Sequence, residues 1–255
     1  MSKITSTIWE IEPHTEAKHE ILRKYLNSWL PIITRWNSRV LYIDGFAGPG
    51  EYIGGKDGSP IIAIKAASEH RTPLGAEVVM VFVEAKKERW EFLKQKIATL
   101  NVPQNIKPEC ICSKFDETLK EILDYLDEQK KTLAPAFVFI DPFGFTGIPL
   151  TLIKRIMENK KCEVLITFMY EEINRFISDA NSWNSLTETF GTDEWKQVIP
   201  ERDPRQRRNL LHDIYKKQLE NETDVKFVRS FEMVNKTNRT DYFLFFGTND
   251  ITGLK

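Results

Sequence analysis

The chain has 255 residues, of which 41% are hydrophobic and 29% are charged, and its net charge is −1. This is enough for one sizeable α/β domain with a hydrophobic core, and we expect a single domain over residues 1–255. No signal peptide and no apolar run of about 18 residues is present, which excludes a transmembrane helix and makes a soluble, cytoplasmic protein the expectation. Three cysteines (Cys110, Cys112 and Cys162) are too few for a disulfide framework or a zinc site of about four ligands, so we expect buried thiols.

Residues 1–38 predict a helical lead-in. Apolar residues spaced three and four apart between Ile21 and Leu30 indicate a helix, and Thr15 is a candidate for its cap. His14 and Lys18 lie near the start of this helix. Either both are solvated helix residues, or the helix covers a cofactor pocket with these two side chains at its edge.

A short apolar run, Val40 to Ile43, predicts a buried strand, and a glycine-rich turn follows it directly. Gly48 and Gly50 allow the backbone to turn tightly and to approach a ligand without a Cβ in the way. Asp44, at the strand end, can accept hydrogen bonds from that ligand. Because ligands of open α/β sheets bind outside the carboxyl ends of the strands, we expect a binding site here.

The spacing in this turn separates two classes of cofactor. A dinucleotide site requires G-x-G-x-x-G, whereas residues 44–50 read acid-x-Phe-x-Gly-x-Gly. This pattern resembles the first motif of class I methyltransferases, which bind S-adenosylmethionine. The resemblance implies a cofactor site lined by the turn, namely Asp44, Gly45, Phe46, Ala47, Gly48 and Gly50. The alternative is a purely structural strand-to-helix turn.

The next segments predict two further strands with an acid after each. The loop from Glu51 to Ser59 is either a mobile cover or an ordinary surface loop, and Ser59-Pro60 begins a helix. A strand over Glu77–Val83 ends at Glu84, where a carboxylate would recognise both ribose hydroxyls. A weaker strand over Ile106–Cys112 precedes Asp116, which either lies beside the adenine or caps the following helix.

The fourth predicted strand, Ala136–Ile140, ends in Asp141-Pro142-Phe143-Gly144-Phe145. Methyltransferases that act on exocyclic amines carry an acid or Asn, a Pro and an aromatic residue at this place. The Asp141 carboxylate and the Pro142 carbonyl would accept the two N–H groups of the amine, and Phe143 or Phe145 would stack on the flipped base. The alternative is that Asp141 caps the helix that starts near Ile148.

The remaining third predicts one more parallel strand (Glu163–Met169), a helical insert (about 173–222) and an antiparallel hairpin (Phe227–Val234 with Tyr242–Phe246). The insert contains a basic cluster that either meets phosphates or is a solvated face balanced by nearby acids. Its members are Arg202, Arg205, Arg207, Arg208, Lys216 and Lys217. The whole order predicts an α/β, Rossmann-like class I methyltransferase fold with a mostly parallel seven-stranded sheet and a C-terminal antiparallel hairpin.

Five segments together resemble the three-Cys-motif partner protein family: residues 14–19, 25–31, 42–52, 58–60 and 139–144. The pattern of residues 42–52 is also similar to that of ribosomal RNA adenine-N6 methyltransferases, which have Asp-Pro-Pro-Tyr where this chain has Asp141-Pro142-Phe143-Gly144. The Asp-Pro-Phe-Gly form is similar to transfer RNA guanine-N2 dimethyltransferases.

These resemblances imply an S-adenosylmethionine-dependent methyltransferase that acts on an exocyclic amine of an RNA or DNA base. A methyltransferase of proteins or small molecules is a further reading. The alternative from another class is an accessory subunit that works with a three-Cys-motif, radical S-adenosylmethionine-type partner protein.

Overall fold

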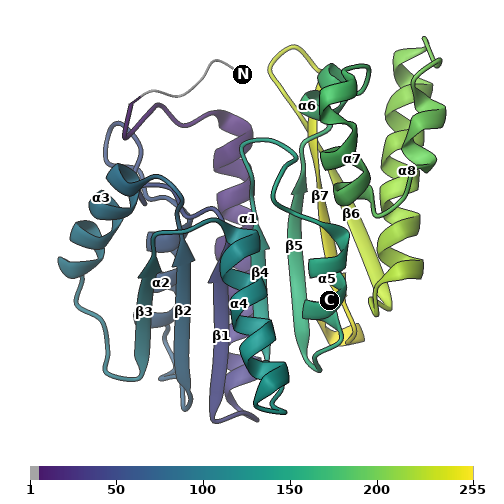
Figure 1. Ribbon diagram of the computed structural model, residues 1–255. Helices are drawn as coiled ribbons and strands as arrows, with labels where there is room; N and C mark the ends of the chain where they lie inside the picture. The colour runs from purple at the N-terminus through teal and green to yellow at the C-terminus, as the bar shows by residue number, and fades with distance from the viewer. Residues whose placement is uncertain (1–5, 255) are drawn as a thin grey trace. The chain divides into compact units, whose positions relative to one another are not determined.

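The computed structural model describes residues 6–254 and contains one seven-stranded sheet in the order β3-β2-β1-β4-β5-β7-β6 (Figure 1). β1 is parallel to β2 and β2 to β3, whereas β7 is antiparallel to both β5 and β6. The predicted fold class is therefore confirmed. The strands are β1 (Arg39–Asp44), β2 (Glu77–Val83), β3 (Ile106–Ile111), β4 (Ala136–Ile140), β5 (Cys162–Phe168), β6 (Phe227–Val234) and β7 (Thr240–Thr248).

The helices follow the predicted order, with two corrections at their starts. They are α1 (Pro13–Thr34), α2 (Ser59–Ser68), α3 (Lys87–Ala98), α4 (Phe115–Glu128), α5 (Leu150–Met157), α6 (Tyr170–Phe176), α7 (Trp183–Phe190) and α8 (Pro204–Glu222), with 3-10 turns η1 (Ala180–Ser182), η2 (Glu194–Val198) and η3 (Ile251–Leu254). Thr15 was expected to cap α1 but lies inside it, because the helix begins at Pro13, which suits a first helical position. Asp116 likewise lies inside the first turn of α4 and is not its cap.

The chain divides into two compact units. One runs through Thr118 and includes Ala134–Ala136, and the other holds Leu119–Leu133 and the chain from Phe137 onward. The first unit contains β1, β2 and β3 with α1, α2 and α3. α2 reads SPIIAIKAAS and is buried on nearly all sides, and α1 packs against it (Figure 1).

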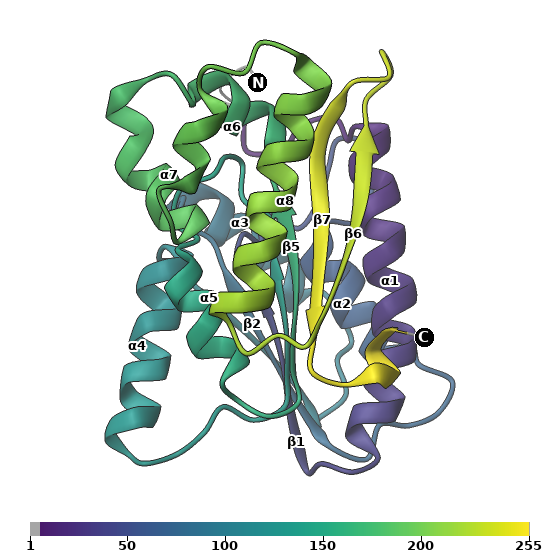
Figure 2. The ribbon, with the colours of Figure 1, turned by 90° about the vertical axis from the view of Figure 1, so that its right-hand side faces the viewer.

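The second unit is built on the antiparallel strands β5, β7 and β6, and α8 runs along β6 and β7 (Figure 2). Its core is aromatic. The ring of Phe168 on β5 stacks on Tyr215 of α8 at 4.5 Å and meets Phe190 and Phe245 edge-on at 5.5 and 5.8 Å. Such ring pairs stabilise beyond their buried area, by about 0.5–1.5 kcal/mol each.

The cysteines depart from the prediction in one respect. Cys162 is buried and Cys110 is partly buried, but Cys112 is exposed because β3 ends at Ile111 and does not reach it. Burial raises the pKa of the Cys110 thiol to about 11, which keeps this thiol protonated at neutral pH.

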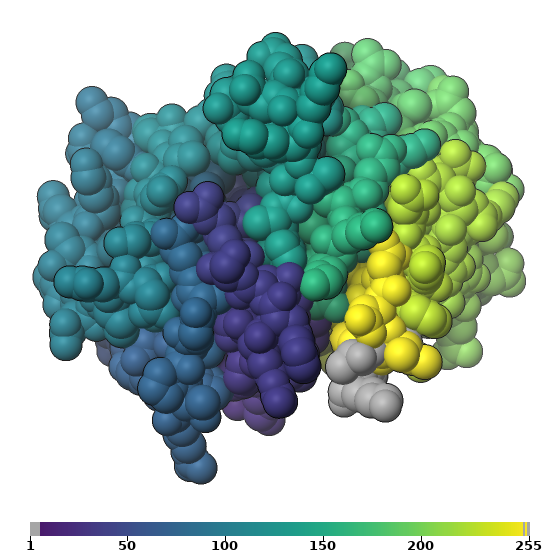
Figure 3. All heavy atoms as spheres, turned by 90° about the horizontal axis from the view of Figure 1, so that it is seen from below, coloured from purple at the N-terminus to yellow at the C-terminus, as the bar shows by residue number. Residues whose placement is uncertain are grey.

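Over the described part of the chain, no helix is both long and apolar enough to cross a membrane. Figure 3 shows the end at which the parallel strands begin; in the first unit, the segments before β1 and β2, coloured purple to blue, form the surface there. The predicted site residues follow the carboxyl ends of the strands or lie near the start of α1, so they lie toward the opposite end of their own unit.

Candidate functional site

The glycine turn after β1 has a backbone that only glycine adopts easily. Gly48 and Gly50 have φ angles of +62° and +78°. A Cβ on Gly50 would lie 2.6 Å from Cδ1 of Leu93, and one on Gly58 would lie 2.8 Å from the backbone carbon of Gly50. The Gly58 N–H donates to the Gly50 carbonyl at 2.7 Å. The glycines at 50 and 58 are therefore required first by packing inside the chain.

Gly48 differs from Gly50 in its surroundings. A Cβ on Gly48 would meet only the Trp9 ring, at an ordinary 3.8 Å. The predicted approach of a ligand to this residue stays a prediction. The requirement for glycine at position 48 comes from its positive φ.

Glu84 fastens the glycine turn to the end of β2. Its Oε2 accepts from the Gly48 N–H at 3.0 Å, and its Oε1 accepts from the Lys86 N–H at 2.7 Å. The residue is only 6% exposed, so it is not a solvated surface acid. Each carboxylate oxygen has two lone pairs, and these contacts use one on each, which leaves one on each for a ligand hydroxyl.

Asp44 is completely buried at the end of β1, and its Oδ1 accepts from the Phe46 N–H at 3.3 Å. The Ala47 N–H donates to the carbonyl of Val83 at 2.9 Å, which is a second link between the turn and β2. Asp44 thus shapes the start of the turn. Its predicted contact with a ligand stays a prediction.

The start of α4 packs directly against the turn. The rings of Phe46 and Phe115 lie 5.6 Å apart, and a Cβ on Gly45 would lie 2.4 Å from the Phe115 ring. Beside Phe115, the Oδ1 of Asp116 is buried and accepts no hydrogen bond from any described residue. A buried carboxylate oxygen without a donor is costly, so a ligand that donates a hydrogen bond would relieve it.

The residues before α1 contribute an aromatic group that sequence reasoning missed. Trp9 meets Tyr52 edge-on at 5.5 Å, and the guanidinium of Arg89 lies 4.6 Å from the Trp9 ring centroid. Arg89 is only 4% exposed, although it sits in the charged helix α3. A cation over a tryptophan face is stabilising. The only sequence signal was a tryptophan in an otherwise irregular segment.

His14 and Lys18 lie on α1, whose first half contacts the loop after the glycine turn. Lys18 is 5% exposed, so the reading of a solvated lysine is wrong. His14 Nε2 lies 3.1 Å from Oε2 of Glu12. The ring of His19, which follows Lys18 on α1, lies 5.7 Å from the ring of Tyr52. The helix therefore lies beside the loop that follows the turn, and the ligand contact of His14 and Lys18 stays a prediction.

The loop from Glu51 to Ser59, which was expected to be either a mobile cover or an ordinary surface loop, is a small hairpin bound to three helices by ion pairs. Glu51 and Asp57 form an isolated antiparallel bridge, and the Tyr52 N–H donates to Lys56 O at 2.9 Å. Ion pairs then tie the hairpin to α1, α2 and α3, namely Lys56–Glu16, Asp57–Lys65 and Glu51–Lys96. These contacts favour the ordinary surface loop over the mobile cover.

The segment after β4 belongs to the second unit. Asp141 is partly exposed and does not cap α5, whose N-cap is Pro149. Phe143 is 46% exposed, whereas Phe145 is 7% exposed and lies 6.2 Å from the ring of Phe176. The Thr189 hydroxyl donates to the Phe145 carbonyl at 2.6 Å. Of the two aromatic candidates, only Phe143 presents its ring to solvent.

Ion pairs neutralise three of the six residues of the basic cluster. Arg208 pairs with Glu232 at 2.9 Å, and Arg207 donates to the Glu201 carbonyl at 3.2 Å. Lys216 and Lys217 pair with Glu220 and Glu194 at 3.7 and 3.1 Å. Among the described residues, Arg202, Arg205 and Arg207 of this cluster form no side-chain ion pair. The solvated, balanced reading therefore holds for Arg208, Lys216 and Lys217.

The predicted residues thus fall into two groups. The first unit brings together the glycine turn, Glu84 and Asp116, with His14 and Lys18 on the neighbouring helix α1. The second unit carries Asp141, Pro142, Phe143 and Phe145 on one segment.

No family model and no curated protein matches the sequence, so the resemblance to the three-Cys-motif partner family stays a prediction. Several solved structures with a similar fold are described as methyltransferases or methylases. An O-methyltransferase from Bacillus cereus in complex with SAH is 12% identical, with 94% of this chain and 83% of that chain covered and a TM-score of 0.49.

Human methyltransferase-like protein 13 in complex with SAH is 8% identical, with 94% of this chain and 87% of that chain covered and a TM-score of 0.45. A fibrillarin/Nop5p complex gives 14% identity, 88% and 81% coverage and a TM-score of 0.41. At these values the likenesses do not assign a ligand or a reaction to this chain.

Proposed function

We propose that the first unit binds S-adenosylmethionine and that the protein is a methyltransferase. The observation that carries this proposal is the carboxylate of Glu84. It is buried at the carboxyl end of β2, it is fixed by the Gly48 and Lys86 N–H groups, and it keeps a lone pair on each oxygen. Two adjacent acceptors of this kind suit the two vicinal hydroxyls of a ribose.

The residues around Glu84 fit the rest of such a cofactor. The orphaned Asp116 oxygen supplies an acceptor for a donor group such as the exocyclic amine of adenine. The turn carries no phosphate-binding G-x-G-x-x-G pattern, which agrees with a ligand that lacks phosphate. When bound, S-adenosylmethionine supplies a methyl group on a positively charged sulfur.

For the acceptor we propose an exocyclic amine of a nucleic-acid base. The amine lone pair is delocalised into the ring, so the amine is a poor nucleophile. The Asp141 carboxylate and the Pro142 carbonyl would accept its two N–H bonds and stabilise the positive charge that develops on nitrogen. The exposed Phe143 ring would stack on the base. These roles rest on the residue types and on their position after β4.

Two measurements test the proposal. Calorimetry with S-adenosylmethionine should detect binding. A dissociation constant of about 1 mM corresponds to a binding free energy of roughly −4 kcal/mol, and absence of binding at that ligand concentration would remove the cofactor assignment. Transfer of labelled methyl onto total RNA, DNA and lysate protein, followed by nucleoside analysis, identifies the acceptor.

Within that assay, Asp141→Ala should lower transfer by at least about a hundredfold, at roughly 1.4 kcal/mol per decade, with cofactor affinity nearly kept. The control is Asp224→Ala, which removes an exposed acid of the second unit. If Asp141→Ala transfers methyl at the parent rate, Asp141 has no role in holding the amine.

The accessory-subunit role follows only from the family resemblance. It predicts that no substrate is methylated by the isolated protein even where S-adenosylmethionine binds. The same pair of measurements therefore separates an enzyme from a subunit that serves a three-Cys-motif partner.

A further inference from the structure

In the second unit, the contacts between α8 and β6 give a counter-charge to Arg208 but none to Arg205. The His212 Nε2 lies 2.9 Å from the hydroxyl of Ser230, and one helical turn earlier Arg208 pairs with Glu232. Helix and strand run in opposite directions here, so the next pair would join Arg205 to Val234. Position 234 holds no acid, and Val234 is 46% exposed.

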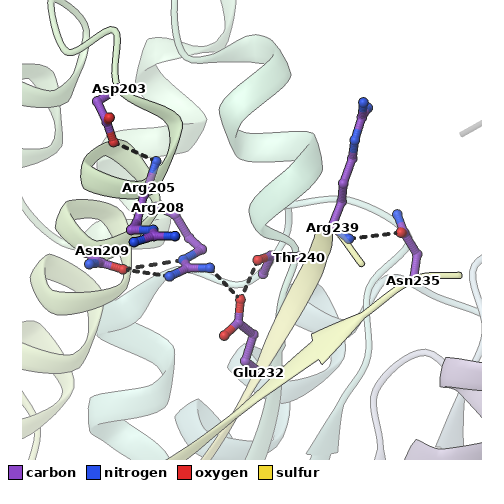
Figure 4. Close-up of polar contacts among 8 residues, drawn as sticks. All are labelled: Asp203, Arg205, Arg208, Asn209, Glu232, Asn235, Arg239 and Thr240. Carbon is purple, nitrogen blue, oxygen red and sulfur yellow. Dashed lines mark hydrogen bonds and ion pairs between the residues drawn. The ribbon is translucent and has the colours of Figure 1, made fainter. Parts of the chain in front are cut away.

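The β6–β7 turn presents a second arginine of this kind. Arg239 is exposed, and its backbone is held by Asn235: the Asn235 Oδ1 accepts the Arg239 N–H at 3.1 Å, and the Asn235 N–H donates to the Arg239 carbonyl at 2.8 Å. The Asn235 Nδ2 also donates to Asp241 at 3.0 Å. Figure 4 shows the Arg239 side chain extending away from this turn.

Two acids near these arginines, Asp203 and Glu232, already accept hydrogen bonds from other groups. The Asp203 Oδ1 accepts the N–H groups of Arg205 and Gln206 at 2.9 and 2.8 Å, and so caps α8. Glu232 is held by Arg208 and by the Thr240 hydroxyl, and Figure 4 shows both contacts. Within residues 6–254, neither the Arg205 nor the Arg239 guanidinium has an ion pair.

This pair lies at the end of the second unit where β5 finishes. Phe168, the last residue of β5, is opposite Phe243 on β7, so the turn before Thr240 extends beyond the carboxyl end of β5. Ligands of α/β sheets bind outside the carboxyl ends of strands. The two arginines are therefore on the side of the unit where a substrate is expected.

We propose that Arg205 and Arg239 bind two phosphates of a nucleic-acid backbone. This inference rests on the proposed nucleic-acid substrate, and it adds the surface that meets that substrate. Guanidinium groups match phosphate oxygens bidentately, and two unneutralised cations on separate elements suit a polymer with repeated phosphates better than one small anion. Phosphates position the strand and carry no sequence information.

The test is fluorescence anisotropy of a labelled single-stranded RNA, and of a DNA of the same length and sequence, across a salt series and without S-adenosylmethionine. Arg205→Gln with Arg239→Gln should reduce the slope of log K against log salt by about 1.4, at about 0.7 per phosphate of a single strand. An equal fall in slope for the RNA and the DNA supports a contact with phosphate, which both polymers carry. A fall for only one of them would assign the contact to a feature of that polymer and would contradict the proposal.

The matched control is Lys216→Gln with Lys217→Gln, which removes the same charge from lysines that are already paired. This control should leave the slope unchanged, and urea unfolding should give equal midpoints for both double variants. An unchanged slope in the arginine variant, or an equal fall in the lysine control, would overturn the proposal. Polyglutamate bound as tightly as RNA, through the same arginines, would assign the surface to an acidic protein instead.

The anisotropy experiment measures nucleic-acid binding without S-adenosylmethionine and without methyl transfer. Loss of the proposed phosphate contacts therefore leaves the calorimetric test of the first unit standing. If no methyl transfer is observed, the role of Arg205 and Arg239 is still decided by the slope of log K against log salt.

Discussion

The polar groups of the glycine turn in the first unit and those on the carboxyl-end surface of the second unit are held differently. In the turn, the Glu84 carboxylate and the Gly48 N–H are buried and bonded to each other. On the second unit, the polar side chains of Arg205 and Arg239 are exposed, as is the apolar ring of Phe143. The buried, preorganised groups of the glycine turn suit a small ligand of fixed shape. The exposed side chains of the second unit suit a large ligand that supplies its own contacts. The predictions below separate the two regions, from the largest expected effect to the smallest.

The two phenylalanines after β4 should differ most in stability. Phe145→Ala removes a buried ring that contacts Phe176 and should cost about 3–5 kcal/mol of unfolding free energy. Phe143→Ala removes a ring that is half exposed and should cost far less, while substrate affinity falls by about 1–3 kcal/mol. Urea unfolding and binding of an acceptor nucleic acid measure these effects. Loss of substrate affinity in a folded Phe145→Ala variant, with Phe143→Ala unaffected, would reverse the assignment.

Two glycines of the same turn should also behave differently. Gly48→Ala and Gly50→Ala both force an alanine into a left-handed backbone, at about 1–2 kcal/mol. Gly50→Ala in addition drives its Cβ against Leu93, and overpacking costs about 1–3 kcal/mol more. Urea unfolding should therefore rank Gly50→Ala as the less stable variant. Equal stability would mean that Leu93 moves aside freely and that the turn is less tightly packed than the contacts indicate.

Glu84→Ala tests the cofactor region directly. It removes the predicted acceptor of the ribose hydroxyls, and hydrogen bonds to charged groups contribute about 1.5–3 kcal/mol, roughly tenfold or more in affinity for S-adenosylmethionine. It also leaves the Gly48 and Lys86 N–H groups without their acceptor, so the unfolding free energy must be measured beside the calorimetry. Glu88→Ala, at an exposed acid in the first turn of α3, is the control. Equal affinity in the two variants would remove Glu84 from the ribose site.

The sequence predicted the sheet well because its strands are apolar runs that end in recognisable polar residues. Val40–Ile43, Glu77–Val83 and Ala136–Ile140 are such runs, and each is followed by an acid. The same local reasoning failed where a distant contact decides the outcome. Nothing near Arg89 indicates that its cation is buried against Trp9, eighty positions earlier.

The choice between nearby residues was equally beyond the sequence. Phe143 and Phe145 have the same residue type and alternate along one segment, so only the packing of Phe145 against α6 distinguishes them. The ion pairs of Arg208 and Lys217 likewise join elements far apart in the chain. Counting basic residues in the sequence therefore overstated the positive charge that remains unpaired and free to meet a phosphate. The count also left out Arg239, which lies in the β6–β7 turn outside the cluster.

The smallest expected effect is a pH dependence near the β6–β7 turn. Partial desolvation, and then a hydrogen bond to the carboxyl of Asp241, raise the pKa of Glu171 in the folded protein above its usual value of 4.5. The folded state therefore binds the proton more tightly than the unfolded state. This contribution to stability is fully present below the ordinary carboxyl pKa and is lost as the pH rises through the raised pKa.

Glu171→Gln mimics the protonated acid at every pH, so it should remove this dependence. We expect the unfolding free energy of the parent, minus that of Glu171→Gln, to fall as the pH is raised through the window above 4.5. Urea unfolding of both proteins over a pH series measures the difference. Asp241→Asn should flatten the fall in part, because it removes the neighbouring charge but leaves the desolvation. A difference that rises with pH would mean that a nearby cation holds Glu171 ionised, and that the carboxyl-end surface is more strongly positive than its ion pairs indicate.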